Sequence, residues 1–265
     1  MQSFEITQGT APLLVSMPHN GTAIPEDISE RMTAGARRVP DTDWHMDRLY
    51  DFAGSLGASV LKPVYSRYVI DLNRPPDGSV LYPGANNTEL CPLSCFDMAP
   101  VYLEGREPGP EEVLQRVETY WRPYHRQMAR ELERLKSEHG IALLYEAHSI
   151  RSKVPRFFRG RLPDLNLGTA AGASCTPRLE KLLRGVLDSA KGYTFKVNGR
   201  FKGGYNTRHY GKPSKNVHAV QLEQAQISYM EETFPFAYDE IRAKKVKPVL
   251  RQLLETMLAW AGERK

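Results

Sequence analysis

The sequence predicts an α/β fold, a single domain with a central mixed, mostly parallel sheet flanked by helices. Short apolar runs of strand length alternate with longer stretches in which apolar residues recur at helical spacing. Hydrophobic residues make up 41% of the 265 residues and charged residues 25%, as in ordinary folded proteins. No internal repeat or linker divides the chain, so we expect one domain over residues 1–265.

The first half of the chain contains three apolar runs that predict strands, over residues 13–17, 58–64 and 68–72. A helix is predicted over 41–56, because an Asp or Thr at its start could cap it and apolar residues recur near helical spacing. Residues 73–109 are rich in Pro, Gly and Asn and predict a long irregular segment. Irregular segments of this length in a compact domain are usually functional.

The second half of the chain alternates in the same way. Strands are predicted over 141–145 and 217–222, each followed closely by an acidic residue. Helices are predicted over 111–139, with an interruption near Pro123, over 177–190 and over 246–261. The remaining stretches, 151–176 and the Gly-rich 196–205, are expected to be irregular.

Composition narrows the class of partner. The net charge is +5, but the basic residues are interleaved with acids and form no nucleic-acid-binding motif, so we expect an anionic small-molecule substrate and no nucleic acid. No run approaches the roughly 20 apolar residues that span a bilayer, and MQSFEITQGT lacks the features of a secretory signal. Cys91, Cys95 and Cys175 form no CxxC pair and are expected to be reduced thiols in a cytoplasmic protein. The sequence carries no signal for an oligomeric state.

Two histidines follow predicted apolar strands, His19 after LLVSMP and His148 after IALLYEA. Sites form at the carboxyl ends of strands in open α/β sheets, and two imidazoles with one carboxylate make a catalytic zinc site with an open position. Asp43 is the candidate carboxylate and Asp41 is its rival. Glu146 is expected to support one histidine through an outer contact. An isolated histidine is usually structural, but two at equivalent strand ends favour a metal site.

Cationic residues in two segments could bind an anionic substrate. The run SRYVIDLNR ends in Asn73-Arg74, and an Arg can grip a carboxylate through two hydrogen bonds. The alternative is an Arg that pairs with a surface acid such as Asp71. A second segment places three cations, Arg200, Lys202 and Arg208, around adjacent glycines, where a basic surface turn is an equally good interpretation.

Glu223 follows the strand-like run VHAVQL. A strand-end glutamate near a metal could take a proton from water, although an ordinary surface glutamate fits this pattern nearly as well.

Taken together, these segments resemble the N-formylglutamate amidohydrolase (N-formylglutamate deformylase) family. The similarity runs along nearly the whole chain, through SMPHNGTAIP, DTDWHMDRLYDFA, SRYVIDLNRPPDG, LLYEAHSIRS, DLNLGT, NGRFKGGYNTRHYG and HAVQLEQAQISYM. That family looks distantly related to zinc carboxypeptidases, aspartoacylases and cell-wall amidases. The resemblance therefore implies a zinc carboxypeptidase/phosphorylase-hydrolase-like α/β fold with one catalytic metal, most simply Zn²⁺, although cobalt, nickel or iron could use similar ligands.

The resemblance also implies roles for individual residues. It implies that His19, Asp43 and His148 hold the metal, that Asn73 and Arg74 bind a substrate carboxylate, that Arg67 polarises the scissile carbonyl and that Glu223 is the general base. The expected reaction is hydrolysis of N-formyl-L-glutamate to L-glutamate and formate, a last step of histidine degradation. The alternatives are an amidohydrolase for another N-acyl acidic amino acid and a non-catalytic metal- or anion-binding protein.

Two departures from the pattern leave choices open. His19 and Asp43 stand 24 positions apart, whereas the first zinc ligands of carboxypeptidases lie close together in a short motif, so Asp41 and Asp43 both remain candidates. The segment CFDMAP lacks a glycine that we expect after its Phe, which could shift substrate preference.

Overall fold

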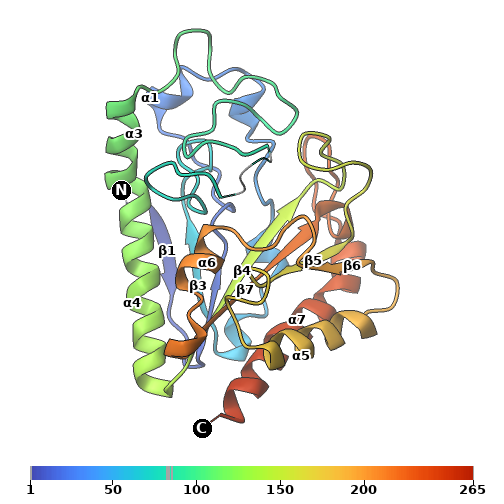
Figure 1. The fold of residues 1–265 in the computed structure, drawn as a ribbon. Helices are drawn as coiled ribbons and strands as arrows, with labels where there is room; N and C mark the ends of the chain where they lie inside the picture. Colours follow the sequence, from blue (N-terminus) through green and yellow to red (C-terminus); the bar gives the residue numbers. More distant parts are fainter. Residues whose placement is uncertain (1, 82–83, 85, 265) are drawn as a thin grey trace.

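A computed structural model describes residues 2–81, 84 and 86–264, and in these residues seven strands form one mixed sheet (Figure 1). The strand order is β1-β3-β2-β4-β7-β5-β6. The strands are β1 (Phe4–Thr7), β2 (Leu13–Ser16), β3 (Ser59–Pro63), β4 (Ala142–Ile150), β5 (Leu165–Gly168), β6 (Phe195–Val197) and β7 (Val217–Ala225). The central strands β3, β2, β4 and β7 are parallel, while β1 and β5 pair antiparallel to β3 and β7. The predicted fold class is confirmed.

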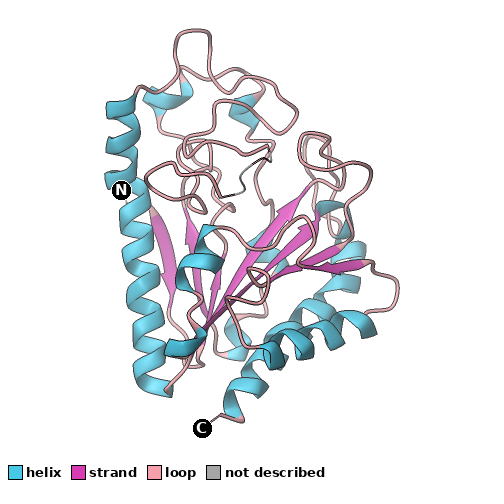
Figure 2. Ribbon diagram, in the orientation of Figure 1, coloured by secondary structure: helices cyan, strands magenta, loops and turns pink. Residues whose placement is uncertain are grey.

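Helices cover both faces of the sheet (Figure 2). Helices α5 (Pro177–Ser189) and α7 (Glu240–Gly262) pack on one face, and α3 (Pro110–Arg116) with α4 (Arg122–His139) forms a long column along the other (Figure 1). Leu13 and Val15 pack in the hydrophobic core on the side of α5 and α7, and Leu14 packs in the core on the side of α4. A strand buried on both faces carries apolar residues on both, and this explains the continuous apolar runs in the sequence.

The long periodic segments fold as predicted. The helices expected over 177–190 and 246–261 are α5 and α7. Helix α7 begins earlier, at Glu240, and is capped by Asp239, whose side chain accepts hydrogen bonds from two backbone N–H groups of the first turn. The helix expected over 111–139 is interrupted as predicted, by a π-helical turn at Val117–Trp121. Pro123, just beyond it, has no N–H to continue a regular α-helical ladder.

Several local predictions were wrong. Residues 41–56 form only the one-turn helix α2 (Met46–Leu49) and a 3₁₀ turn, because His45 adopts a left-handed conformation (φ 60°) that a helix cannot continue through. Residues 68–72 form no strand, although they are buried. The stretch 151–176 contains β5, and β4 and β7 extend through His148 and Glu223 rather than ending before them.

The rest of the chain is mostly irregular. Short helices occur at α1 (Glu26–Ser29) and α6 (Tyr205–Tyr210), and 3₁₀ turns at Ala36–Arg38, Gly54–Leu56, Pro213–Lys215 and Gln226–Ser228. The segment 73–109 contains no named helix or strand among its described residues, as predicted; residues 82, 83 and 85 lie outside the described part. No described helix combines the length and apolar character needed to cross a membrane.

Candidate active site

A cavity lies beyond the carboxyl ends of the parallel strands β2, β4 and β7. The strands bring His148 and Glu223 to it, and irregular segments bring His19, Arg67 and Arg200. This is the edge at which ligands bind in open α/β sheets.

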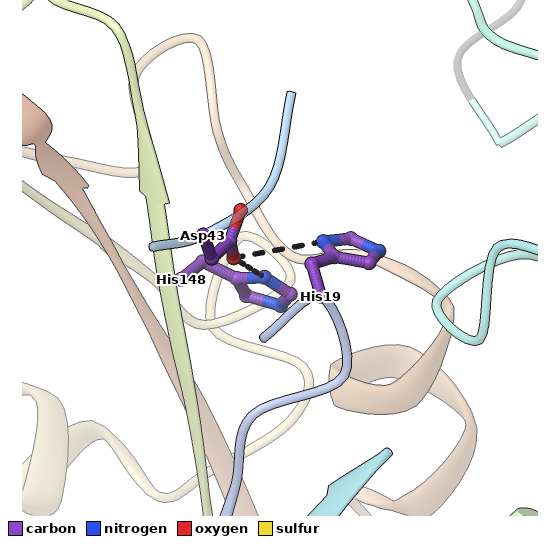
Figure 3. A group of neighbouring side chains, drawn as sticks. All are labelled: His19, Asp43 and His148. Carbon is purple, nitrogen blue, oxygen red and sulfur yellow. Dashed lines mark hydrogen bonds and ion pairs between the residues drawn. The ribbon is translucent and has the colours of Figure 1, made fainter. Parts of the chain in front are cut away.

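His19, Asp43 and His148 meet at one point of this edge (Figure 3). Their ligand atoms all lie within 4.8 Å of one another, and all three residues are buried. Asp43 Oδ2 is 3.1 Å from His148 Nδ1 and 3.6 Å from His19 Nδ1. Asp43 Oδ1 is buried and has no hydrogen-bond partner among the described residues. Two imidazoles and a carboxylate with an unsatisfied oxygen fit a divalent metal ion.

Local structure sets these positions. His148 lies within β4, whose nine residues are all buried, and its backbone pairs with Glu223 of β7, while the ladder to β2 ends two residues earlier, at Glu146. His19 and Asp43 stand on irregular segments joined by a hydrogen bond from Asp43 N–H to His19 O (3.0 Å). Asn20 accepts a hydrogen bond from Met46 N–H (3.1 Å), which ties the same two segments together again.

An outer set of contacts orients the imidazoles. His19 Nε2 donates to Asp71 Oδ1 (2.7 Å), which leaves the Nδ1 lone pair directed toward Asp43 and the Arg67 guanidinium. Asp71 also accepts from Arg67 Nη2 (2.6 Å). His148 Nε2 lies 3.0 Å from Asn73 Nδ2 and 3.6 Å from a Glu146 carboxylate oxygen. Such outer partners fix ring orientation in metal sites.

The charges at the three-residue group favour a cation. Burial alone would raise the pKa of Asp43, but the hydrogen bonds and charges of His148 and His19 outweigh it and lower that pKa. Burial opposes the charged form of His148, but Asp43 and Glu146 outweigh it and raise the pKa of His148 to about 10. The negative charge of the carboxylates therefore draws positive charge to the point where the donor atoms meet, as a cation site requires.

Glu223 stands opposite His148 in the parallel pairing of β4 and β7, and both side chains line the cavity. Burial raises the pKa of Glu223 to about 8, and the charge of Asp43 acts in the same direction, whereas His148 and Arg67 oppose the shift. A carboxylate whose pKa lies close to neutral can both accept and return a proton.

The substrate-binding candidates separate into two groups. Asn73, Arg74 and Arg200 line the cavity; Arg74 donates to Thr88 Oγ1 (2.9 Å) and Arg200 to Phe157 O (2.8 Å). Lys202 and Arg208 are exposed and are not among the residues that line it.

Asp41 lies outside the three-residue group. Its carboxylate accepts from the Tyr68 hydroxyl (2.6 Å), from Phe96 N–H (2.7 Å) and from Arg151 (3.3 Å). It therefore anchors neighbouring segments, and the geometry favours Asp43 over Asp41 as the acid beside the histidines.

Sequence reasoning missed the roles of two residues at the site. Asp71 was considered only as a surface partner for an Arg, yet it is 1% exposed and bridges Arg67 and His19. The sequence feature that indicates this role of Asp71 is its spacing of four residues from Arg67 within an apolar run. Asn206, whose N–H donates to Asn73 Oδ1 (2.9 Å) and whose side-chain amide donates to Glu146 (3.0 Å), was also missed, because its partners are far away in the sequence.

The fold and this group define a class of protein. An α/β sheet that brings together a buried His/Asp/His group able to hold a metal ion, a buried glutamate and several arginines at one cavity is typical of hydrolases.

The comparisons identify the family within that class. Residues 11–230 match the model of the N-formylglutamate amidohydrolase family. Over 257 residues the chain is 54% identical to the N-formylglutamate deformylases of Pseudomonas putida and Pseudomonas aeruginosa, which covers 97% of this chain and 96% of each relative. The chain belongs to the N-formylglutamate amidohydrolase family, and its class is hydrolase, as the sequence predicted.

Two solved structures share the fold of this chain. The crystal structure of N-formylglutamate amidohydrolase from Ralstonia eutropha JMP134 superposes with a TM-score of 0.85 at 26% identity, with both chains fully covered. A gene product of Agrobacterium tumefaciens superposes with a TM-score of 0.72 at 14% identity, covering 100% of this chain and 97% of the other, and shares the fold.

Proposed function

We propose that this chain hydrolyses N-formyl-L-glutamate to L-glutamate and formate. The observation that carries the proposal is the convergence of His19, Asp43 and His148 with Glu223 at one cavity of a chain in this family. The relatives that are 54% identical are named for this reaction. Three arginines around the cavity suit a substrate with two carboxylates.

A divalent cation, which we propose to be Zn²⁺, would be held by His19 Nδ1, His148 Nδ1 and Asp43. When bound, such an ion supplies Lewis acidity, which lowers the pKa of water toward 7 and polarises a carbonyl. Asp71 keeps the Nδ1 lone pair of His19 directed inward through its hydrogen bond to Nε2. Glu146, 3.6 Å from Nε2 of His148, would face the proton that this nitrogen carries when Nδ1 binds the cation.

The other side chains bind the substrate and move a proton. Asn73 and Arg74 would hold one carboxylate of the substrate and Arg200 the second. Arg67, buried beside His19, would donate a hydrogen bond to the formyl oxygen as negative charge develops there; loss of one such donor typically costs about 10²–10³ in rate. Glu223 would accept a proton from water at its carboxylate and return it to the departing amine.

The acyl group is the main point on which related amidohydrolases could differ. One methyl group changes discrimination in a pocket by only about 1–3 kcal/mol, so activity on formyl and acetyl substrates must be compared directly. Measuring kcat/KM for N-formylglutamate, N-acetylglutamate and N-formylaspartate separates these possibilities. We expect N-formylglutamate to be preferred, and a higher kcat/KM for another of these substrates would reassign the substrate.

A glutamate-to-glutamine pair of variants tests the enzyme mechanism. Glu223→Gln removes the proton acceptor but no metal ligand, so turnover should fall by about 10²–10⁴ while zinc content is unchanged. Glu131→Gln makes the same change at another buried glutamate, on α4 and bonded to Ser59 and Arg134, and should retain turnover. Full activity in Glu223→Gln would refute the mechanism, and no turnover in the zinc-loaded wild type would favour a non-catalytic binding protein.

The remaining proposals concern the domain organisation, the cellular compartment and the metabolic role of the chain. We propose that residues 1–265 act as one catalytic domain in the cytoplasm, at a last step of histidine degradation. All three cysteines are free and buried, which suits a reducing compartment.

A further inference from the structure

Residues 67–74 carry four side chains of the site and yet belong to no strand or helix. Arg67, Asp71, Asn73 and Arg74 all line the cavity. Because no ladder pairs this segment, its buried carbonyl groups need other hydrogen-bond donors.

One helical column supplies those donors from its side chains. Side chains of the column donate hydrogen bonds from Arg116 Nη1 to Val69 O (2.9 Å), from His125 Nε2 to Leu72 O (3.0 Å) and from Trp121 Nε1 to Arg74 O (3.0 Å). The three donor residues are 3%, 5% and 7% exposed, so these donors have little access to water and depend on the carbonyls as partners.

The π turn brings the three donors to the same face of the column. Arg116 and Trp121 are five positions apart, which in a regular α-helix would separate them by about 140° around the axis. The turn Val117–Trp121 instead uses i→i+5 hydrogen bonds, such as Arg122 N–H to Val117 O, and this wider turn aligns residues five apart. Trp121 and His125 then follow at the ordinary spacing of four and stack with ring centroids 3.6 Å apart.

The donor state of His125 is set by its surroundings. The Leu72 carbonyl can only accept, so His125 Nε2 carries the proton and Nδ1 accepts from the Tyr210 hydroxyl (2.9 Å). Burial lowers the pKa of His125 to about 3, so the ring stays neutral with one donor and one acceptor.

We propose that the π turn is a positioning device, in which Trp121 and His125 hold the backbone of Leu72–Arg74 so that Asn73 and Arg74 face the substrate carboxylate. This inference rests on the proposed function, because it assigns the held segment to substrate binding. Trp121 and His125 touch the backbone behind the site and not the cavity, so they are positioning residues.

Replacing Trp121 by phenylalanine tests the proposal. Trp121→Phe removes the indole N–H and keeps most of the apolar volume. We expect KM for N-formylglutamate to rise about ten-fold, the change that follows when one hydrogen bond of ordinary strength is lost, while kcat changes less than three-fold. Trp260→Phe is the matched control, since Trp260 is buried in the core on the opposite face of the sheet, and its KM should equal that of the wild type.

A pair of changes at His125 separates positioning from general stability. His125→Gln keeps an N–H near the position of Nε2, and His125→Leu removes it. We expect KM in His125→Gln to lie within three-fold of the wild type and KM in His125→Leu to rise about ten-fold. Loss of stability alone would lower the amount of active enzyme in both variants and leave KM unchanged, and that result would overturn the proposal.

Hydrogen exchange gives a readout that does not depend on activity. The backbone amides of 67–74 should exchange at least ten-fold faster in Trp121→Phe than in the wild type, and those of β4 should not change. Unchanged exchange together with unchanged KM would refute the positioning role. If Trp121→Phe shows this faster exchange but the wild type does not hydrolyse N-formylglutamate, the proposed function fails while the anchoring of the segment stands.

Discussion

Replacing Gly204 by alanine should displace Asn73 without altering its chemistry. Gly204 has φ of −78°, which alanine adopts freely, so only space decides the effect. The added Cβ would lie 2.3 Å from Asn73 Nδ2, whereas ordinary contact begins at 3.4 Å, so the amide must move by about 1 Å.

That movement should be costly for catalysis. It breaks the hydrogen bond from Asn206 N–H to Asn73 Oδ1 (2.9 Å) and the contact between Asn73 Nδ2 and His148 Nε2 (3.0 Å). Overpacking of this kind costs about 1–3 kcal/mol of stability, and a misplacement of about 1 Å in a positioning group can lower the rate about 100-fold. We therefore expect kcat/KM for N-formylglutamate to fall about 100-fold in Gly204→Ala, measured by formate release, while urea unfolding shows the moderate loss of stability.

Two further variants make the result decisive. Gly185 is exposed on α5 with nothing within 4 Å of an added Cβ, so Gly185→Ala should leave kcat/KM unchanged and stabilise the helix by up to about 1 kcal/mol. In an Asn73→Ala background, Gly204→Ala should cost little more, because the clashing atoms are gone. Wild-type kcat/KM in Gly204→Ala, or an equal loss in both backgrounds, would refute the reasoning.

Three other predictions concern acid stability, an outer contact and the metal. His218 is fully buried against Trp260, and burial lowers its pKa to about 4. The unfolded chain takes up a proton at this histidine near pH 6.5, whereas the folded chain does not. The free energy of unfolding should therefore fall by about 2 kcal/mol between pH 7.5 and 5. His218→Leu should lack this part of the slope in urea unfolding, and equal slopes would contradict the assignment. Asp71→Asn should weaken zinc binding about 10–100-fold in a chelator competition, because His19 loses a charged acceptor and Arg67 its partner; unchanged affinity would show that the contact is not needed. Removing divalent metal with a chelator should abolish hydrolysis and lower the melting temperature, and added Zn²⁺ should restore both; activity that survives in protein shown by elemental analysis to hold no metal would exclude the proposed cation.

The sequence predicted the parts of the fold that depend on periodicity. Helix α5 and strand β2 have long or strongly apolar patterns and formed close to the expected limits. Helix α7 ends close to its expected limit but begins six residues earlier. The helix expected over 41–56 was wrong because the backbone there is held by distant partners: Asp43 N–H donates to His19 O, and the His45 ring donates to Phe236 O (2.7 Å). No local pattern encodes contacts of that range.

Only part of the candidate site could be predicted, again because no local pattern encodes contacts between distant residues. His19 and His148 could be recognised because each follows an apolar run, but Asp41 and Asp43 are equivalent in the sequence and differ only in what surrounds them. Asp41 is occupied by Tyr68 and Phe96, whereas Asp43 has one oxygen without a partner among the described residues. The strand expected over 68–72 failed because its carbonyls are taken by side chains from the helical column, more than 40 residues away.

The site combines residues on paired strands with residues on irregular segments, and this affects how such enzymes can diverge. His148 and Glu223 face each other across paired strands, so a one-residue insertion in either strand would turn one of them to the opposite face of the sheet. Arg74 and Arg200 stand on irregular segments that tolerate changes in length and sequence. Substitutions that accumulate in this architecture can therefore change which anion is bound while the proton-transfer geometry stays fixed.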